Sequence, residues 1–223
     1  MPALLCGPGS CGSCPRGIVV AVLRALVLAF LLALVGCGSS NVKPGTAPVY
    51  YSDSRSVELL PTTAMTEPID MPQHIAGSFT KPDGSTDSFE ADSWVRANDS
   101  ILSITMFTGF GTTLGEITYE RDSVKAESSV LDVTKMKAEY LVADFQVCFY
   151  PFAALKENFE KAGFTFVESR DASADGDVSA AGDYVRTLKE GDRVILVATK
   201  KAREVSLVNE LRKYSYRITL GDK

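Results

Sequence analysis

Short runs that alternate apolar and polar residues fill the chain from Gln73 onward, and this pattern restricts the fold most. In the run 101–107, three apolar side chains alternate with a serine and a threonine. A period of two residues puts the apolar side chains on one face of a strand. Turn sequences such as Lys81-Pro82-Asp83-Gly84-Ser85 separate the runs. Because strands and helices do not alternate regularly, the sequence favours an antiparallel sheet over a parallel one.

The pattern predicts about ten antiparallel strands with a helical insertion two thirds along the chain. The strands are expected at 75–80, 88–97, 101–107, 112–120, 123–130, 164–169, 184–188, 193–199, 205–209 and 214–220. A helix is expected over 152–161, because Pro151 suits a first helical turn and three apolar residues share one stripe. The preceding stretch, 136–149, has a mixed signal with aromatic residues that suit either state.

A separate apolar segment precedes this region. Arg24 is followed by the uncharged run 25–35, and then by Gly36 and Cys37. A basic residue, an apolar core of this length and a small-residue site are typical of a signal peptide. A membrane-spanning helix needs about 20 apolar residues. The alternative is an uncleaved anchor that begins at Ile18 and tolerates Arg24 inside it.

The end of this segment, Leu34-Val35-Gly36-Cys37, resembles a bacterial lipobox. The resemblance implies that a diacylglyceryl group is joined to the Cys37 sulfur, that cleavage precedes Cys37 and that the new amine is acylated. Two or three acyl chains hold a protein stably on a membrane, whereas one chain gives reversible binding. Gly38, rather than an aspartate, follows the cysteine. By the sorting pattern of enteric bacteria this implies the outer membrane, with the domain on its periplasmic face.

The expected organisation has three parts: a signal peptide at 1–36, the lipidated cysteine with a flexible tether at 37–72, and a folded domain at 73–223. Half of the ten prolines lie in the tether, a composition that suits an extended linker. Two of the 23 basic residues and none of the 28 acidic ones lie in the signal peptide. The mature chain is therefore acidic and has no basic cluster, which excludes nucleic acid as a partner.

The residues that could carry chemistry form no catalytic constellation. His74, the single histidine, has no cysteine or carboxylate at metal-ligand spacing, so a structural or solvated role is expected. Asp144 lies in an apolar stretch, where a bonded core role is favoured over an active-site role. The glycines of 109–115 open a strand rather than a helix, unlike a dinucleotide loop. We expect no enzyme, no metal and no cofactor; an enzyme would need a polar cluster at His74, Glu139 or Asp144.

The predicted strands carry more apolar side chains than a thin sheet needs. Such a face must be covered by helices or must curve around a cavity. Eight or more curved strands can enclose a space of lipid size. The predicted lining of a cavity for acyl chains is Phe79, Trp94, Leu102, Ile104 and Met106. The alternative is a structural or assembly lipoprotein, in which these side chains fill a core and no ligand binds.

The order of these motifs resembles that of LolB, an outer-membrane receptor for lipoproteins, and of its periplasmic relative LolA. The motifs that carry the resemblance are Gly77-Ser78-Phe79, Trp94, Leu102-x-Ile104-x-Met106, Gly109-Phe110-Gly111, Pro151-Phe152-x-x-Leu155 and Tyr214-x-Tyr216-x-Ile218. The resemblance implies a mainly β fold, an incomplete antiparallel barrel with helices as a lid over a hydrophobic cavity.

The same resemblance implies a function and partners. Acyl chains or lipoproteins would be the cargo, and a periplasmic LolA-like carrier would be a partner. Phe110 matches the leucine that LolB uses at the membrane, so it is the expected membrane contact. The segment 140–146 is more similar to an uncharacterised LolB-like lipoprotein family, catalogued as a domain of unknown function. That similarity implies a lipid-handling scaffold more firmly than reception of lipoproteins.

Overall fold

The computed structural model describes residues 48–128, 137–170 and 182–222. Pro44–Lys223 form one compact unit. The predicted signal peptide and the lipidation site Cys37 lie outside the described residues.

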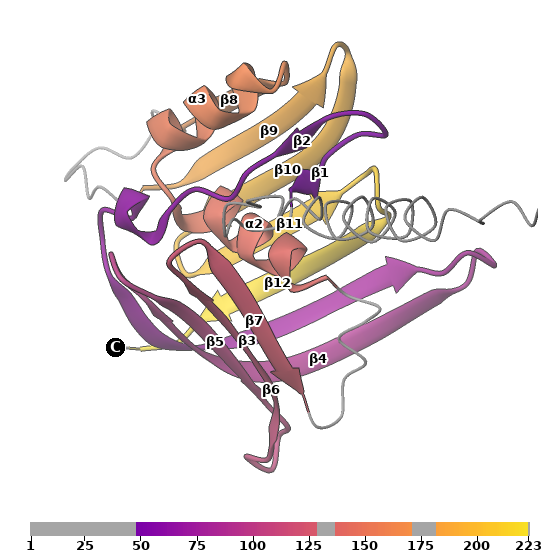
Figure 1. Cartoon of the computed structure of the whole chain (residues 1–223). Coiled ribbons are helices and arrows are strands. Elements are labelled where there is room, and N and C mark those ends of the chain that lie inside the picture. The colour runs from indigo at the N-terminus through magenta and orange to yellow at the C-terminus, as the bar shows by residue number, and fades with distance from the viewer. Residues whose placement is uncertain (1–47, 129–136, 171–181, 223) are drawn as a thin grey trace, which may run out of the picture. The chain divides into compact units, whose positions relative to one another are not determined.

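Ten antiparallel strands form one curved sheet that does not close (Figure 1). They are β3 (Ile69–Thr80), β4 (Thr86–Ala97), β5 (Leu102–Phe107), β6 (Thr113–Glu120), β7 (Ser123–Ser128), β8 (Thr165–Ser169), β9 (Tyr184–Glu190), β10 (Arg193–Lys201), β11 (Glu204–Asn209) and β12 (Tyr214–Leu220). Their order is β7-β6-β5-β4-β3-β12-β11-β10-β9-β8. The sheet thus consists of two meanders, joined where β12 pairs with β3. The prediction of a mainly β fold with an open antiparallel sheet is confirmed.

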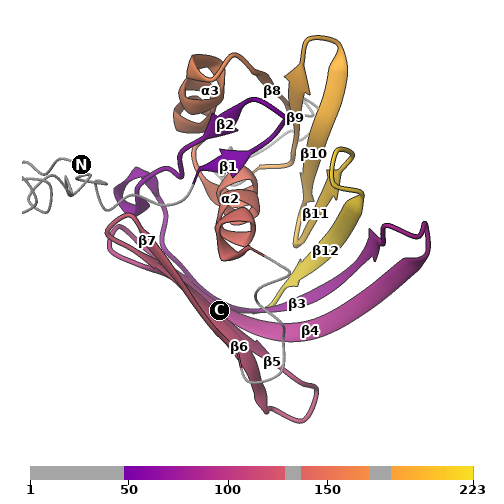
Figure 2. The ribbon, with the colours of Figure 1, turned by 45° about the vertical axis from the view of Figure 1, so that its right-hand side comes forward.

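Two helices connect the two edges of the sheet and cover its concave face. They are α2 (Ala138–Phe149) and α3 (Phe152–Lys161). Figure 2 shows α2 in the hollow of the sheet, and α3 packs against β8. Every residue of α2 from Val142 to Cys148 is buried. A helix buried on all sides has no polar stripe, which explains its mixed sequence signal.

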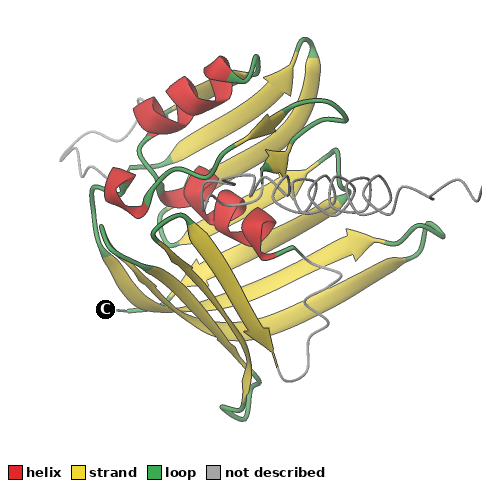
Figure 3. Cartoon of the chain, viewed as in Figure 1, coloured by secondary structure: helices red, strands yellow, loops and turns green. Residues whose placement is uncertain are grey.

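Residues 48–72 lie on the domain, although the sequence assigned them to the tether. They form the short strands β1 (Val49–Tyr50) and β2 (Ser56–Val57), the turn η1 (Thr62–Ala64) and the start of β3. The physical reason is a set of apolar side chains that join the buried core: Val49, Tyr51, Val57, Leu59 and Met65. Figure 3 shows this segment running across the helices. The predicted tether therefore ends before residue 48.

A side-chain amide fixes this segment to α2. The backbone N–H of Leu60 donates to Gln146 Oε1 at 3.0 Å, and Gln146 Nε2 donates to the Leu60 carbonyl at 2.7 Å. The Tyr119 hydroxyl, from β6, donates to the same carbonyl at 3.0 Å. The amide thus pairs with the backbone as a neighbouring strand would, and it satisfies polar groups that would otherwise be buried without partners.

Arg186, on β9, holds the C-terminal end of α2. Its Nη1 donates to the carbonyls of Val147 and Tyr150 at 2.7 and 2.9 Å, and its Nε contacts Glu168 Oε2 at 2.8 Å. The last carbonyls of a helix lack partners within the helix, and a positive charge there also interacts favourably with the helix dipole. Both charged side chains of the pair are buried.

Candidate functional site

The five residues predicted to line a cavity do not lie together. Leu102 and Ile104 face the concave side and are buried in the core, and Met106 follows them on the same face, half-buried. Phe79 is also on this face, near the end of β3, and is 41% exposed. Trp94 alternates with the buried Val95, so its side chain lies on the convex face, where it is 44% exposed.

Four aromatic side chains, which we call the aromatic patch, share one end of the concave face: Phe79, Phe89, Tyr214 and Tyr216. The strand register brings them together, because Tyr214 pairs with Phe79, and Tyr216 pairs with Gly77, which in turn pairs with Phe89. Phe79 and Phe89 are each 41% exposed. The two tyrosine rings stack with their centroids 6.3 Å apart.

Gly77 makes room for the patch. A Cβ placed at Gly77 would lie 2.6 Å from the Phe89 ring and 2.7 Å from the backbone oxygen of Ser215. The Phe89 ring therefore lies over the bare backbone of β3. This contact gives a physical reason for a glycine two residues before Phe79.

Phe79 and Phe89 are exposed, whereas Tyr214 and Tyr216 are half-buried, because the β3–β4 hairpin extends beyond the rest of the sheet. Strand β5 pairs with β4 only from Asp92 to Ala97, so Thr86–Ala91 project past it. Helix α2 packs chiefly against β1, β7, β10 and β11 rather than against this hairpin. Figure 2 shows the hairpin reaching away from the helices. Large apolar side chains gathered in the open mark sites of interaction more often than chance exposure.

A buried carboxylate lies behind the two tyrosines. The Tyr214 hydroxyl donates to Asp144 Oδ2 at 2.6 Å, and Asn209 Nδ2 donates to the Tyr214 oxygen at 3.1 Å. Burial raises the pKa of Asp144 to about 7, although the bond from Tyr214 and the positive charge of Arg212 act to lower it. Asp144 is thus a bonded core residue. His74 lies on the opposite face of the sheet, so these two candidates for chemistry do not meet.

Arg212 lies at the edge of the aromatic patch, and no pattern in the sequence indicated its role. It belongs to the turn between β11 and β12. Its Nη2 donates to the Tyr50 carbonyl at 2.7 Å and to the Tyr140 hydroxyl at 2.6 Å. Its guanidinium carbon lies 3.9 Å from the centroid of the Tyr140 ring. These contacts fix the direction of the guanidinium group.

Phe110 stands alone at the tip of the β5–β6 hairpin. The turn is closed by Thr108, whose backbone N–H donates to the Thr112 carbonyl and whose hydroxyl accepts from the backbone N–H groups of Phe110 and Thr112. Gly111 has a φ of +80°, which a side chain would disfavour. The Phe110 side chain is 100% exposed. The turn therefore presents a large apolar group directly to its surroundings.

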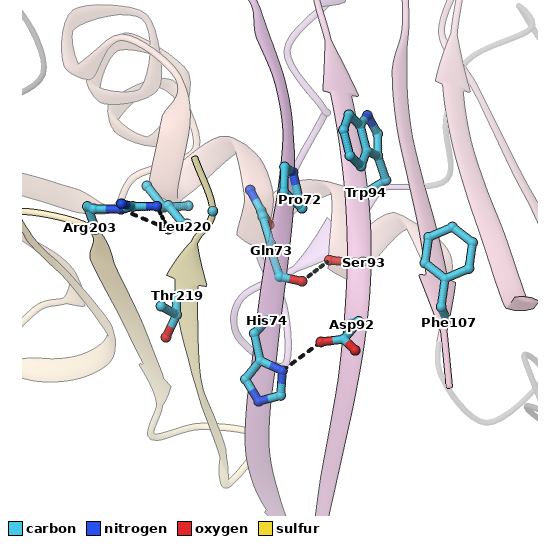
Figure 4. Close-up of a pocket in the computed structure, with 11 residues that line it drawn as sticks. Pro72, Gln73, His74, Asp92, Ser93, Trp94, Phe107, Arg203, Thr219 and Leu220 are labelled. Atoms are coloured by element: carbon cyan, nitrogen blue, oxygen red, sulfur yellow. Dashed lines mark hydrogen bonds and ion pairs between the residues drawn. The ribbon is translucent and has the colours of Figure 1, made fainter. Parts of the chain in front are cut away.

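A shallow pocket of about 430 Å³ lies on the convex face (Figure 4). Trp94, Phe107 and Pro72 form its apolar part. His74 is held between Asp92 and Glu90, with nitrogen–oxygen distances of 2.8 and 2.9 Å. The bond with Asp92 raises the pKa of His74, since a nearby carboxylate favours the charged ring.

The described residues, 48–128, 137–170 and 182–222, contain neither a metal-binding cluster nor a membrane-spanning helix. In these ranges no three histidine, cysteine, aspartate or glutamate side chains converge to hold a metal ion. No helix in the same ranges has the length and apolar character to cross a membrane.

Comparisons with known proteins give one family and several slight structural likenesses, two of which are described below. A family described as "Protein of unknown function (DUF3261)" matches residues 73–222. The LolA superfamily protein NE2245 from Nitrosomonas europaea is 10% identical, with a TM-score of 0.32 over 73% of this chain and 88% of that one. A domain described as outer membrane lipoprotein-sorting, from Vibrio parahaemolyticus, is 10% identical, with a TM-score of 0.28 over 69% and 83%. No curated protein matches.

Proposed function

Because this chain belongs to the DUF3261 family, whose description assigns no activity, we propose a function from the structure: the domain binds acyl chains on the aromatic patch, without catalysis. One observation carries the proposal. Phe79 and Phe89 are 41% exposed on a face where Leu102 and Ile104 are buried and Met106 is half-buried.

The chemistry of the patch suits a flexible hydrocarbon. Aromatic rings offer broad apolar surfaces, and the patch adds hydroxyls only at its tyrosine edge. Removal of a methylene group from water contributes about 0.8 kcal/mol to binding. A chain that lies along Phe79 and Phe89 needs no charged group to be held. It can also leave again for a membrane, where its environment is equally apolar.

The proposal includes a membrane anchor at Cys37, which lies outside the described residues. Even fully extended, the stretch from Cys37 to Pro48 spans at most about 40 Å. An acylated Cys37 would thus keep the domain close to the outer membrane, with Phe110 available to enter the lipid surface. A periplasmic LolA-like carrier is the partner that we propose for exchange of cargo.

A binding experiment tests the proposal. Residues 44–223 are titrated with a fluorescent long-chain fatty acid, and the variants Phe79→Glu and Phe89→Glu are compared with the unchanged protein. We expect binding by the unchanged protein and its loss in both variants. An acyl chain lying on the patch would remove water from the new carboxylate, which is costly. Val208→Glu is the matched control, since Val208 is 39% exposed but lies on the convex face. No binding by the unchanged protein refutes the proposal.

The second candidate is a structural lipoprotein that binds no ligand. It is favoured by the burial of Leu102 and Ile104, which pack in the core with Ile117 and Tyr119. This function predicts that fatty acid leaves the unfolding midpoint unchanged. Acyl binding predicts instead that the midpoint rises with ligand concentration.

A further inference from the structure

The turn that carries Arg212 is tied to the aromatic patch. Arg212 precedes Tyr214 by two residues, and the backbone N–H of Thr80, next to Phe79, donates to the Lys213 carbonyl at 2.9 Å. Figure 2 shows the start of β12 beside the end of β3. The guanidinium group and the apolar patch therefore lie at the same end of the concave face, within reach of one ligand.

The guanidinium group is held in place yet retains donors. Both of its hydrogen bonds use Nη2, and its plane is fixed by the Tyr140 ring. Among the described residues, nothing accepts from its Nη1 or Nε. Each of these remaining N–H groups can donate a charge-assisted hydrogen bond to an oxygen of a carboxylate or a phosphate.

Unlike other basic side chains near it, Arg212 forms no ion pair with a carboxylate of the described residues. Arg203 contacts Asp222 at 2.5 Å, Arg217 contacts Glu204 at 3.4 Å, and the neighbouring Lys213 contacts Glu210 at 3.3 Å. No carboxylate of the described chain lies within 4.0 Å of the Arg212 nitrogens. Asp144 interacts with this charge at longer range but is buried and bonded to Tyr214.

We infer that Arg212 binds the anionic head group, a carboxylate or a phosphate, of a ligand whose acyl chain lies on the aromatic patch. The inference rests on the proposed acyl binding and narrows its ligand class to amphiphiles with a negative head. It assigns separate roles to the two parts of the site: the rings hold the chain, and the guanidinium group selects and orients the head.

The test compares acids with their neutral analogues. Affinities of residues 44–223 are measured for a long-chain fatty acid, for its methyl ester and for a lysophosphatidic acid with the same chain. Each is measured with the unchanged protein, Arg212→Gln and the control Arg217→Gln, whose arginine is on the convex face. We expect Arg212→Gln to weaken acid binding about 10-fold and to leave ester binding unchanged, as expected for loss of a charge-assisted hydrogen bond. Arg217→Gln should change neither.

The outcomes separate this inference from the proposed function. If the ester binds and Arg212→Gln changes the affinity for neither the acid nor the ester, the inference is wrong and acyl binding stands. If neither acid nor ester binds the unchanged protein, both fail. A larger effect on the phosphate than on the carboxylate identifies a phospholipid head, and the reverse identifies a free fatty acid. If Arg212→Gln does not fold, the affinities of the unchanged protein are measured at several salt concentrations instead. The inference requires that salt weakens binding of the acid and leaves binding of the ester unchanged.

Discussion

Asp144 should make the stability of the domain fall as the pH rises from about 4 to about 7. In the unfolded chain its pKa is near the ordinary value of 3.8, whereas burial raises the folded value to about 7. Between these two values the unfolded chain has released the proton that the folded chain still binds. Raising the pH therefore favours unfolding across this window, and the effect is constant above about pH 7 and below about pH 4.

The size of the effect follows from the two pKa values. Each unit of difference is worth about 1.4 kcal/mol, so a difference of about three units amounts to about 4 kcal/mol. The variant Asp144→Asn cannot ionise, and its amide oxygen can still accept the bond from Tyr214. Relative to this variant, the unchanged protein should lose about 4 kcal/mol of unfolding free energy between about pH 4 and pH 7.

Urea unfolding at a series of pH values measures this difference. Subtracting the variant from the unchanged protein removes the contribution of all other titrating groups. Glu127→Gln, at an exposed carboxylate of β7 on the convex face, is the control and should leave the slope nearly unchanged. Parallel curves for the unchanged protein and Asp144→Asn would show that the buried carboxyl keeps an ordinary pKa, which refutes the reasoning.

Three further predictions concern other parts of the structure. Arg186→Met should lower the unfolding free energy by about 3–5 kcal/mol, because Glu168 loses its buried partner and keeps only Arg170, while the Val147 and Tyr150 carbonyls lose their donor. Urea unfolding measures this, and a loss under about 1 kcal/mol contradicts it. Phe110→Ser should leave stability unchanged but weaken binding of residues 44–223 to phospholipid vesicles in flotation assays; equal flotation contradicts the membrane contact. Gly77→Val should displace the Phe89 ring and reduce the fatty-acid affinity of the folded protein at least about 10-fold. An unchanged affinity in the same titration contradicts this.

The local pattern of the sequence predicted most of the sheet, because a strand shows its period of two wherever one face is buried. The predicted helix 152–161 coincides with α3, since its apolar stripe is clear. The pattern failed for 48–72, where Val49, Val57 and Leu59 are scattered among polar residues and prolines. Their burial depends on a hydrophobic surface formed by helices that are distant in the chain, and no local periodicity within 48–72 indicates that surface.

The candidate site could be predicted only in part, for a related reason. The alternation of Trp94 with Val95 shows that the two side chains lie on opposite faces, but it does not show which face the helices cover. Packing decides that, and it placed Val95 inside. Arg212 had no sequence signal at all, because its position depends on Tyr140 and Tyr50, which are distant in the chain.

The site exists because two distant halves of the chain pair. Phe79 and Phe89 belong to the first meander, and Tyr214, Tyr216 and Arg212 belong to the second. The pairing of β3 with β12 is the contact that joins them. Neither half alone supplies both an apolar surface and a fixed positive charge. On the proposed function, ligand binding depends on a strand pair that closes across most of the folded domain, and bound ligand should stabilise that pair because it contacts both partners.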